Sequence, residues 1–172
     1  QAHPLFAEEK VTLPEGTLVI ADEEKILAIA GVIGCEESKT TESTTRLLLE
    51  SAHFDPVAVR KASRALGIHT DSSARFERGS DPTAPLVGAG RVTHLLEAHT
   101  TWRRVGQTGV VGDWTDPARS ICLSVAAAAA FIGCALTPEE VKDRLERYGF
   151  AVQGTGDDLV VRVPPHRIWD VE

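Results

Sequence analysis

The stretch LTPEE, residues 136–140, is the clearest local structural signal in the sequence, and it predicts the start of a helix. Thr137 stands at the N-cap, Pro138 fits the first helical position, and Glu140 occupies the place where a capping box requires a glutamate. The helix is expected to run until Gly149, because glycine commonly follows a helix end.

Strands are predicted on both sides of this helix. Residues 120–123 are typical of a short strand, and the alanine-rich residues 125–132 are typical of a short helix. Beyond the capped helix, residues 150–152 and 159–163 are separated by a glycine-containing turn and predict a hairpin. Residues 119–172 are therefore expected to form a small α+β module.

The part of the chain before this module also mixes strands with helices. Residues 17–21 and 26–30 predict a hairpin that continues into the glycine-containing residues 31–34. Residues 46–52 are mostly apolar and predict a third, buried strand. The residues between the last two segments are polar and rich in threonine, which is typical of a loop.

Two helices are predicted after these strands. Asp55 and Pro56 fit an N-cap and a first helical position, and Gly67 is expected to end that helix. Residues 69–73 are expected to form a polar turn, and residues 85–98 a second, longer helix. The predicted fold class is therefore α+β, with a first domain at residues 1–100, a linker or strand region at 101–118, and the small module at 119–172.

Composition limits the function classes that fit the chain. The formal net charge is -7 and aromatic residues make up 5%, which argue against a basic nucleic-acid platform or a base-stacking surface, and against DNA as a partner. Any RNA contact would have to be local. No run of about 18 apolar residues is present, so we expect no membrane partner. Cys35, Cys122 and Cys134 lack zinc-ligand spacing and are expected to be buried thiols in a reducing cytosol.

Three strings in the first part resemble a known family. AIAGVIG at residues 28–34 resembles "AIAGVMGG", and LLESAHFDP at 48–56 resembles "LLESAYFDP", both from the β subunit of bacterial phenylalanyl-tRNA synthetase. RALGIHTDSSARFERGSDP at 64–82 resembles "RRLGLRTDASYRFERGVDP" of the same family. Each string alone is weak, but the three together, in the right order and spacing, are highly specific.

The resemblance extends into the second part. Residues 136–140, 148–150 and 163–167 resemble "IS-EE…LGF…VPSWR" of the domain that follows in the family, so the similar region covers roughly residues 16–172. The resemblance implies a mixed-sheet editing domain, incomplete at its N-terminus, followed by a small α+β domain. We therefore expect the chain to be an internal piece of a longer protein, an expectation that the start at Gln1 and the absence of methionine also favour.

The family resemblance also implies an activity. Its members support the ATP- and magnesium-dependent charging of tRNA(Phe) with phenylalanine, in a cytoplasmic α2β2 enzyme whose α subunit activates and transfers the amino acid. The domain that this chain resembles hydrolyses tyrosine wrongly attached to that tRNA. The expected partners are therefore the α subunit and tRNA(Phe), with ATP and Mg²⁺ as cofactors of the whole enzyme and none in this chain.

The same resemblance assigns an editing pocket to five residues, Glu50, Gly31, Gly34, Thr70 and Ser72. Glu50 would accept a hydrogen bond from the tyrosine phenol, and an acceptor left unpaired by phenylalanine would give strong discrimination. The glycines would let a ring lie against the backbone, although they could equally just shape a turn. Thr70 would form a pocket wall. Ser72 replaces a family alanine, so its hydroxymethyl group could narrow the pocket or add a hydrogen-bond partner.

No catalytic residue is assigned with confidence. His69 is expected to be merely exposed, and Arg75, Glu77 and Arg78 are expected to hold a turn through ion pairs. The family's pocket also uses a histidine from an earlier segment, which by the resemblance lies before Gln1. We therefore expect this chain alone to hydrolyse the ester weakly or not at all.

A metal site is not expected in this chain. Asp170 resembles a family carboxylate implicated in magnesium binding, but its partner acids would lie beyond Glu172. Two other interpretations remain open: a freestanding tRNA-binding or trans-editing protein, and a structural module for subunit contacts. The module at 119–172 favours the synthetase, since a freestanding editor would not need it.

Overall fold

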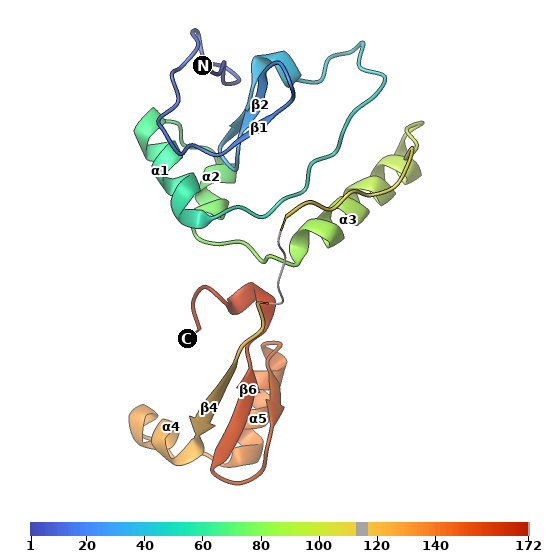
Figure 1. Cartoon of the computed structure of the whole chain (residues 1–172). Helices are drawn as coiled ribbons and strands as arrows, with labels where there is room; N and C mark the ends of the chain where they lie inside the picture. Colours follow the sequence, from blue (N-terminus) through green and yellow to red (C-terminus); the bar gives the residue numbers. More distant parts are fainter. Residues whose placement is uncertain (113–116, 172) are drawn as a thin grey trace. The chain divides into compact units, whose positions relative to one another are not determined.

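The computed structural model describes residues 1–112 and 117–171 (Figure 1). The chain divides into two compact units, Gln1–Val105 and Gly106–Glu172, each with its own sheet. Residues 113–116, which belong to the predicted 101–118 region, lie outside the described residues. The described remainder of that region contains no strand before Ser120.

The sheet of the first unit is antiparallel throughout, with the order β1-β2-β3. It consists of β1 (Val19–Ala21), β2 (Ile26–Ile29) and β3 (Ile33–Gly34), and a bulge lies between Ile20 and Ala21. The predicted hairpin is therefore confirmed. The expectation of a mixed sheet is wrong within the described residues, because no parallel pair forms there.

The first predicted helix is confirmed at both ends. It is α1 (Pro56–Leu66), and the carboxylate of Asp55 accepts a hydrogen bond of 2.7 Å from the amide of Ala58. Gly67 ends the helix in the left-handed conformation, at a φ of 65°, which glycine adopts without steric cost. A 3₁₀ turn, η1 (Glu36–Ser38), precedes this region in the chain.

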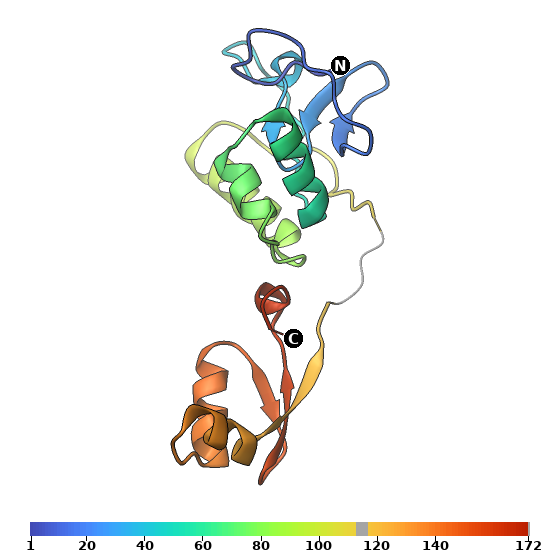
Figure 2. The ribbon, with the colours of Figure 1, turned by 90° about the vertical axis from the view of Figure 1, so that its left-hand side faces the viewer.

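The polar turn predicted at residues 69–73 is instead the start of a short helix, α2 (Asp71–Phe76). Thr70 caps it by accepting from the amide of Ser73, and the hydroxyl of Ser73 accepts from the amide of Thr70. α1 and α2 contact each other and lie side by side in Figures 1 and 2.

The second long helix is confirmed as α3 (Ala84–His99), but it has no buried residue. Its apolar side chains Leu86 and Val87 are exposed rather than packed into the core of this unit. The sequence pattern thus predicts the helix but not its burial, because an apolar helical face is buried only where another part of the protein packs against it.

The strand predicted at residues 46–52 is wrong. Residues 46–54 (the 46–54 segment) have no regular secondary structure and belong to no described strand (Figure 1). Leu48 within this segment is 94% exposed. A strand exists only through hydrogen bonds to a neighbour, and none of the described strands pairs with this segment.

The core of the first unit lies between its sheet and α1. This core consists mainly of small and medium-sized apolar side chains. Phe54 and Phe76 pack against it as an aromatic pair with ring centroids 5.2 Å apart. The buried members of the core are Ala2, Ile29, Val32, Cys35, Val59 and Ala62.

The second unit follows the predicted order closely. It contains β4 (Ser120–Ser124), α4 (Val125–Ile132), α5 (Pro138–Arg147), β5 (Ala151–Gln153), β6 (Asp158–Arg162) and the 3₁₀ turn η2 (Pro165–Arg167). The strands pair antiparallel in the order β4-β6-β5. The predicted capping box is confirmed, since Thr137 accepts from the amide of Glu140 and the carboxylate of Glu140 accepts from the amide of Thr137.

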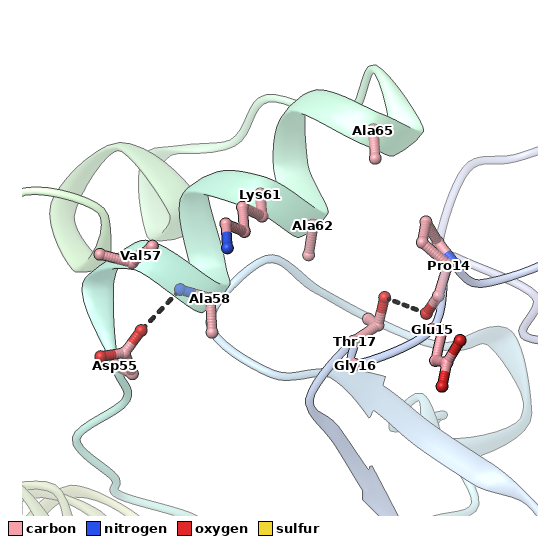
Figure 3. Close-up of a pocket in the computed structure, with 10 residues that line it drawn as sticks. All are labelled: Pro14, Glu15, Gly16, Thr17, Asp55, Val57, Ala58, Lys61, Ala62 and Ala65. Atoms are coloured by element: carbon pink, nitrogen blue, oxygen red, sulfur yellow. Dashed lines mark hydrogen bonds between the residues drawn. The ribbon is translucent and has the colours of Figure 1, made fainter.

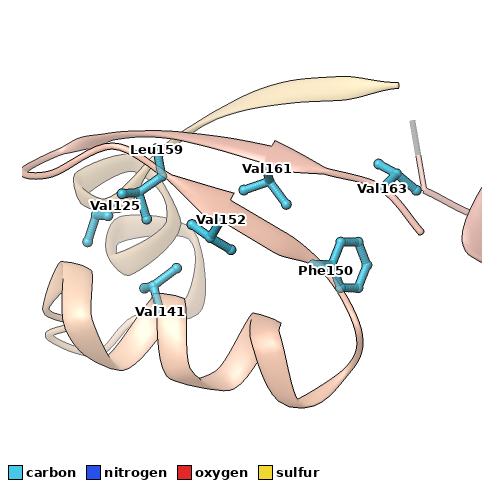
Figure 4. Packing of buried hydrophobic residues seen from close by; sticks show 7 residues of the cluster. All are labelled: Val125, Val141, Phe150, Val152, Leu159, Val161 and Val163. Atoms are coloured by element: carbon cyan, nitrogen blue, oxygen red, sulfur yellow. The ribbon is translucent and has the colours of Figure 1, made fainter. Parts of the chain in front are cut away.

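The core of the second unit lies between its sheet and α5. Figure 4 shows Val141 of α5 directed toward the side chains of the sheet. Leu159, Val161 and Val163 are spaced two residues apart, as expected for one face of a strand, and are at most 2% exposed. The remaining buried members are Val125, Phe150 and Val152.

The expectation of three buried thiols holds only for Cys35. Cys122 and Cys134 are exposed. Cys122 lies on the side of β4 that the helices of this unit do not cover, and Cys134 follows the C-cap of α4. Among the described residues, no helix is long and apolar enough to cross a membrane.

Candidate functional site

Three of the predicted pocket residues meet where β2 turns into β3. The hydroxyl of Thr70 donates to the carbonyl of Val32 at 2.6 Å, and the hydroxyl of Ser72 donates to the carbonyl of Gly31 at 3.0 Å. The start of α2 is thus attached to the turn at Gly31 by two side-chain hydrogen bonds. The hydroxyl by which Ser72 differs from alanine makes one of them.

The two predicted glycines lie against protein side chains. Gly31 has a φ of +69°, and a Cβ atom there would lie 2.8 Å from Cγ2 of Val59 and 3.2 Å from the ring of Phe54. At Gly34 a Cβ atom would lie 3.3 Å from Cδ1 of Leu5. These contacts account for both glycines through backbone shape and close packing. Their role beside a ligand stays a prediction.

Glu50 lies in the 46–54 segment, apart from the Gly31 cluster. Its side chain is exposed, yet loss of water around it raises the pKa of its carboxyl group. The raised pKa then indicates protein on one side of Glu50. Within the described residues no hydrogen bond joins Glu50 to Thr70 or Ser72.

Neighbours of Glu50 attach the segment to the region where α3 begins. The hydroxyl of Ser51 donates to the carbonyl of Pro85 at 2.8 Å, and Nδ1 of His53 shares a hydrogen bond of 2.8 Å with the hydroxyl of Ser80. Burial lowers the pKa of His53, and the carboxylates of Asp81 and Asp55 oppose that effect. Sequence reasoning missed these contacts, because their partners lie 27 and 34 residues away.

A cavity of about 400 Å³ lies between α1 and the turn at residues 14–17 (Figure 3). In Figure 3, Ala58 and Ala62 point across it toward Thr17, and the charged Glu15 and Lys61 also line it. None of the five predicted pocket residues lines this cavity. The cavity is an open groove lined in part by small apolar side chains. Its lining residues form no recognisable catalytic arrangement.

The neighbouring polar residues have structural contacts. His69 is exposed, and its Nδ1 lies 3.1 Å from the hydroxyl of Ser63. The turn after α2 is held by hydrogen bonds to the backbone, from Arg78 to the carbonyl of Ala74 and from Arg60 to the carbonyl of Glu77. Within the part of the chain that the structure describes, these guanidinium–carbonyl contacts hold the turn in place of the expected ion pairs of Arg75, Glu77 and Arg78.

Asp170 is engaged by a cation of its own chain. Both of its carboxylate oxygens accept from Nε of Arg167, at 2.9 and 3.0 Å, and these bonds lower the pKa of Asp170. The same guanidinium lies 5.8 Å from the centre of the Phe150 ring. The role of Asp170 as a magnesium ligand stays a prediction. No group of three or more His, Cys, Asp or Glu side chains in the described part of the chain is arranged to hold a metal.

Comparison with known proteins places this architecture in a class. The profile of the B3/4 domain family matches residues 3–101, and the profile of the tRNA synthetase B5 domain matches residues 121–172. The chain belongs to the B3/4 domain family, and a B5 domain follows in the same chain.

Its relatives show which kind of B3/4 protein the chain resembles. It is 40% identical over 164 residues to the phenylalanine–tRNA ligase beta subunit of Idiomarina loihiensis, covering 95% of this chain and 21% of that protein. The corresponding subunit of Colwellia psychrerythraea is 42% identical over 158 residues (89% and 19%), and that of Chlamydia muridarum 34% over 163 residues (95% and 21%). The chain thus carries B3/4 and B5 domains of the phenylalanine–tRNA ligase beta-subunit type. It spans about a fifth of the length of the curated relatives it matches.

Proposed function

We propose that this chain is part of a phenylalanine–tRNA ligase beta subunit and that its first unit hydrolyses tyrosine wrongly attached to tRNA(Phe). The observation that carries the proposal is the order of the two domain matches, B3/4 and then B5, in a chain aligned over 95% of its length with beta subunits. The match at residues 121–172 favours this proposal over a freestanding tRNA-binding or trans-editing protein, because such a protein would not need a B5 domain.

Glu50 is the proposed selectivity residue. A phenol that donates to its carboxylate pairs an acceptor that phenylalanine would leave unpaired, and such a bond to a charged group contributes about 1.5–3 kcal/mol. The partial loss of water at Glu50 supports this role, because a carboxylate less well solvated by water gains more from a phenol hydrogen bond.

The reaction is hydrolysis of the ester between the amino acid and the terminal ribose of the tRNA. Water adds to the ester carbonyl and the ribose hydroxyl leaves, so the protein's contribution is to hold the ester in place. We propose that Thr70 and Ser72, through their hydrogen bonds to the turn at residues 31–32, shape the site that binds the ester.

The remaining parts of the proposal concern the whole ligase. Its α subunit and tRNA(Phe) are the proposed partners, in a cytoplasmic α2β2 enzyme. ATP and Mg²⁺ serve amino-acid activation on the α subunit.

The test is a graft. Residues 1–172 replace the matching region of the Idiomarina beta subunit, which is purified with its α subunit and assayed on tyrosyl- and phenylalanyl-tRNA(Phe). Glu50→Ala should lower kcat/KM for tyrosyl ester hydrolysis by about 10- to 100-fold, as follows from loss of one hydrogen bond to a charged group. Hydrolysis of the phenylalanyl ester should change little, because that substrate makes no such bond.

Glu42→Ala is the matched control, since Glu42 is another exposed acid in the same part of the chain. It should leave both rates unchanged. Equal rates for the Glu50→Ala variant and the unaltered graft on both esters would remove Glu50 from the site. A graft that charges tRNA(Phe) normally but does not hydrolyse the tyrosyl ester would contradict the proposed function itself.

A further inference from the structure

The 46–54 segment is attached to the rest of the unit on one side. Ser51 bonds to the carbonyl of Pro85, in the first turn of α3, and His53 bonds to Ser80, in the turn that precedes α3. A Cβ atom added at Gly88 would lie 3.4 Å from the hydroxyl of Ser51, so the segment runs close to the first turns of the helix. Two residues spaced i, i+2 thus make contacts to one region.

Glu50 lies at one end of this attached stretch. It directly precedes Ser51, so the hydrogen bond from Ser51 to Pro85 limits where the backbone of Glu50 can lie. Phe54, at the other end of the stretch, contacts the Gly31 turn, since its ring would lie 3.2 Å from a Cβ atom at Gly31. The residues from Glu50 to Phe54 are therefore held both at the start of α3 and at the Gly31 turn.

We propose that Ser51 and His53 are positioning residues that hold the segment on the entrance to α3 and thereby fix the place of the Glu50 carboxylate. This inference rests on the proposed function for its consequence in editing. Its structural part stands independently, on the two hydrogen bonds and on the position of Glu50 directly before Ser51. No described strand pairs with the segment, so side-chain contacts, rather than backbone hydrogen bonds of a sheet, must hold it in place.

The magnitudes show why two such bonds are needed. A single hydrogen bond contributes about 0.5–1.5 kcal/mol, whereas ordering the backbone of one residue costs about 1–2 kcal/mol. Neither bond alone offsets the ordering of residues 50–53. Loss of either should therefore loosen the segment and return Glu50 toward full solvation.

The structural test uses the 172-residue chain and NMR titration of the Glu50 carboxyl group. In the unaltered chain its pKa should lie above that of an ordinary glutamate, because protein displaces water on one side. Ser51→Ala and His53→Ala should each bring the pKa back toward the ordinary value and increase the fast motion of the amides of residues 49–53.

Two further variants keep this test specific. His53→Asn retains a hydrogen-bonding atom where Nδ1 of His53 lies, so it should restore the raised pKa at least in part. Thr45→Ala alters an exposed residue directly before the 46–54 segment and should have no effect. Unchanged titration and unchanged amide motion in both alanine variants would overturn the positioning role.

The functional test uses the graft described above. Ser51→Ala and His53→Ala should each reduce the preference for tyrosyl over phenylalanyl ester by about 3- to 10-fold through kcat, with KM for the tRNA little changed. If Glu50→Ala abolishes the preference while neither alanine variant alters it, the positioning role fails and the proposed function stands. If the NMR result is obtained but Glu50→Ala has no effect, the proposed function fails and the structural attachment stands.

Discussion

Gly31 has to satisfy two conditions at once, a left-handed backbone and close contact with Val59. Gly67 satisfies only the first, because a Cβ atom there would have no neighbour within 4 Å. Gly31→Ala should therefore cost about 2–5 kcal/mol of unfolding free energy, from backbone strain plus overpacking. Gly67→Ala should cost about 1–2 kcal/mol from strain alone. Urea unfolding followed by NMR signals of the first unit measures both. Equal losses would show that the crowding at Gly31 relaxes.

The site residues illustrate what a sequence alone can convey at this scale. Thr70 and Ser72 could be singled out only through resemblance to a family, because their bonds reach residues 38 and 41 positions away. Nothing in the local pattern of Ser51 or His53 distinguishes them from ordinary loop residues. Long-range hydrogen bonds depend on how the chain folds back on itself, which periodicity does not encode.

At the scale of elements, the signals that were read correctly are those confined to a few neighbouring residues. Asp55 and Gly67 bound α1, and Thr137 starts α5, because caps act within one helical turn. The short helix α2 was missed because its capping box uses Ser73 in place of the usual glutamate or glutamine. The strand expected at residues 46–52 failed because its formation depends on a distant partner.

The two capping threonines should differ in their energetic weight. Thr137 caps α5 and its side chain makes no other hydrogen bond within the described residues, so Thr137→Ala should cost about 1 kcal/mol. Thr70 caps α2 and also donates to the carbonyl of the buried Val32, so Thr70→Ala should cost about 2–4 kcal/mol. Thr70→Ser keeps the hydroxyl and should recover most of the loss. Chemical denaturation of the three variants is the measurement, and a ranking with Thr137→Ala as the costlier change would contradict it.

For the whole molecule, the two hydrophobic cores share no residue. Leu159 is 1% exposed and Val160, its neighbour on the opposite side of β6, is 43% exposed. Leu159→Ala should destabilise the second unit by about 2–5 kcal/mol, while the matched control Val160→Ala should cost less than about 1 kcal/mol. The unfolding midpoint of the first unit, followed by its own NMR signals, should not move with either change. A parallel loss in the first unit would show that the units unfold together.

The α+β class and the second unit were predicted well from sequence because caps and a hairpin turn act within a few neighbouring residues. The first unit was predicted less completely. α3 has the apolar residues of a packed helix and yet none of its residues is buried. The sequence pattern of α3 predicts a helix. Whether its apolar face is buried depends on the parts of the protein that pack against it, which the local pattern does not encode.

The exposed leucines at residues 47–49 also matter for the behaviour of this polypeptide at high concentration. The leucine side chains are exposed, and no described strand pairs with the backbone of this run. Such a run favours pairing with other copies of the chain, so we expect aggregation on storage. A lysine in place of Leu48 would act as a gatekeeper there, repelling incoming strands without touching the Ser51 and His53 attachments.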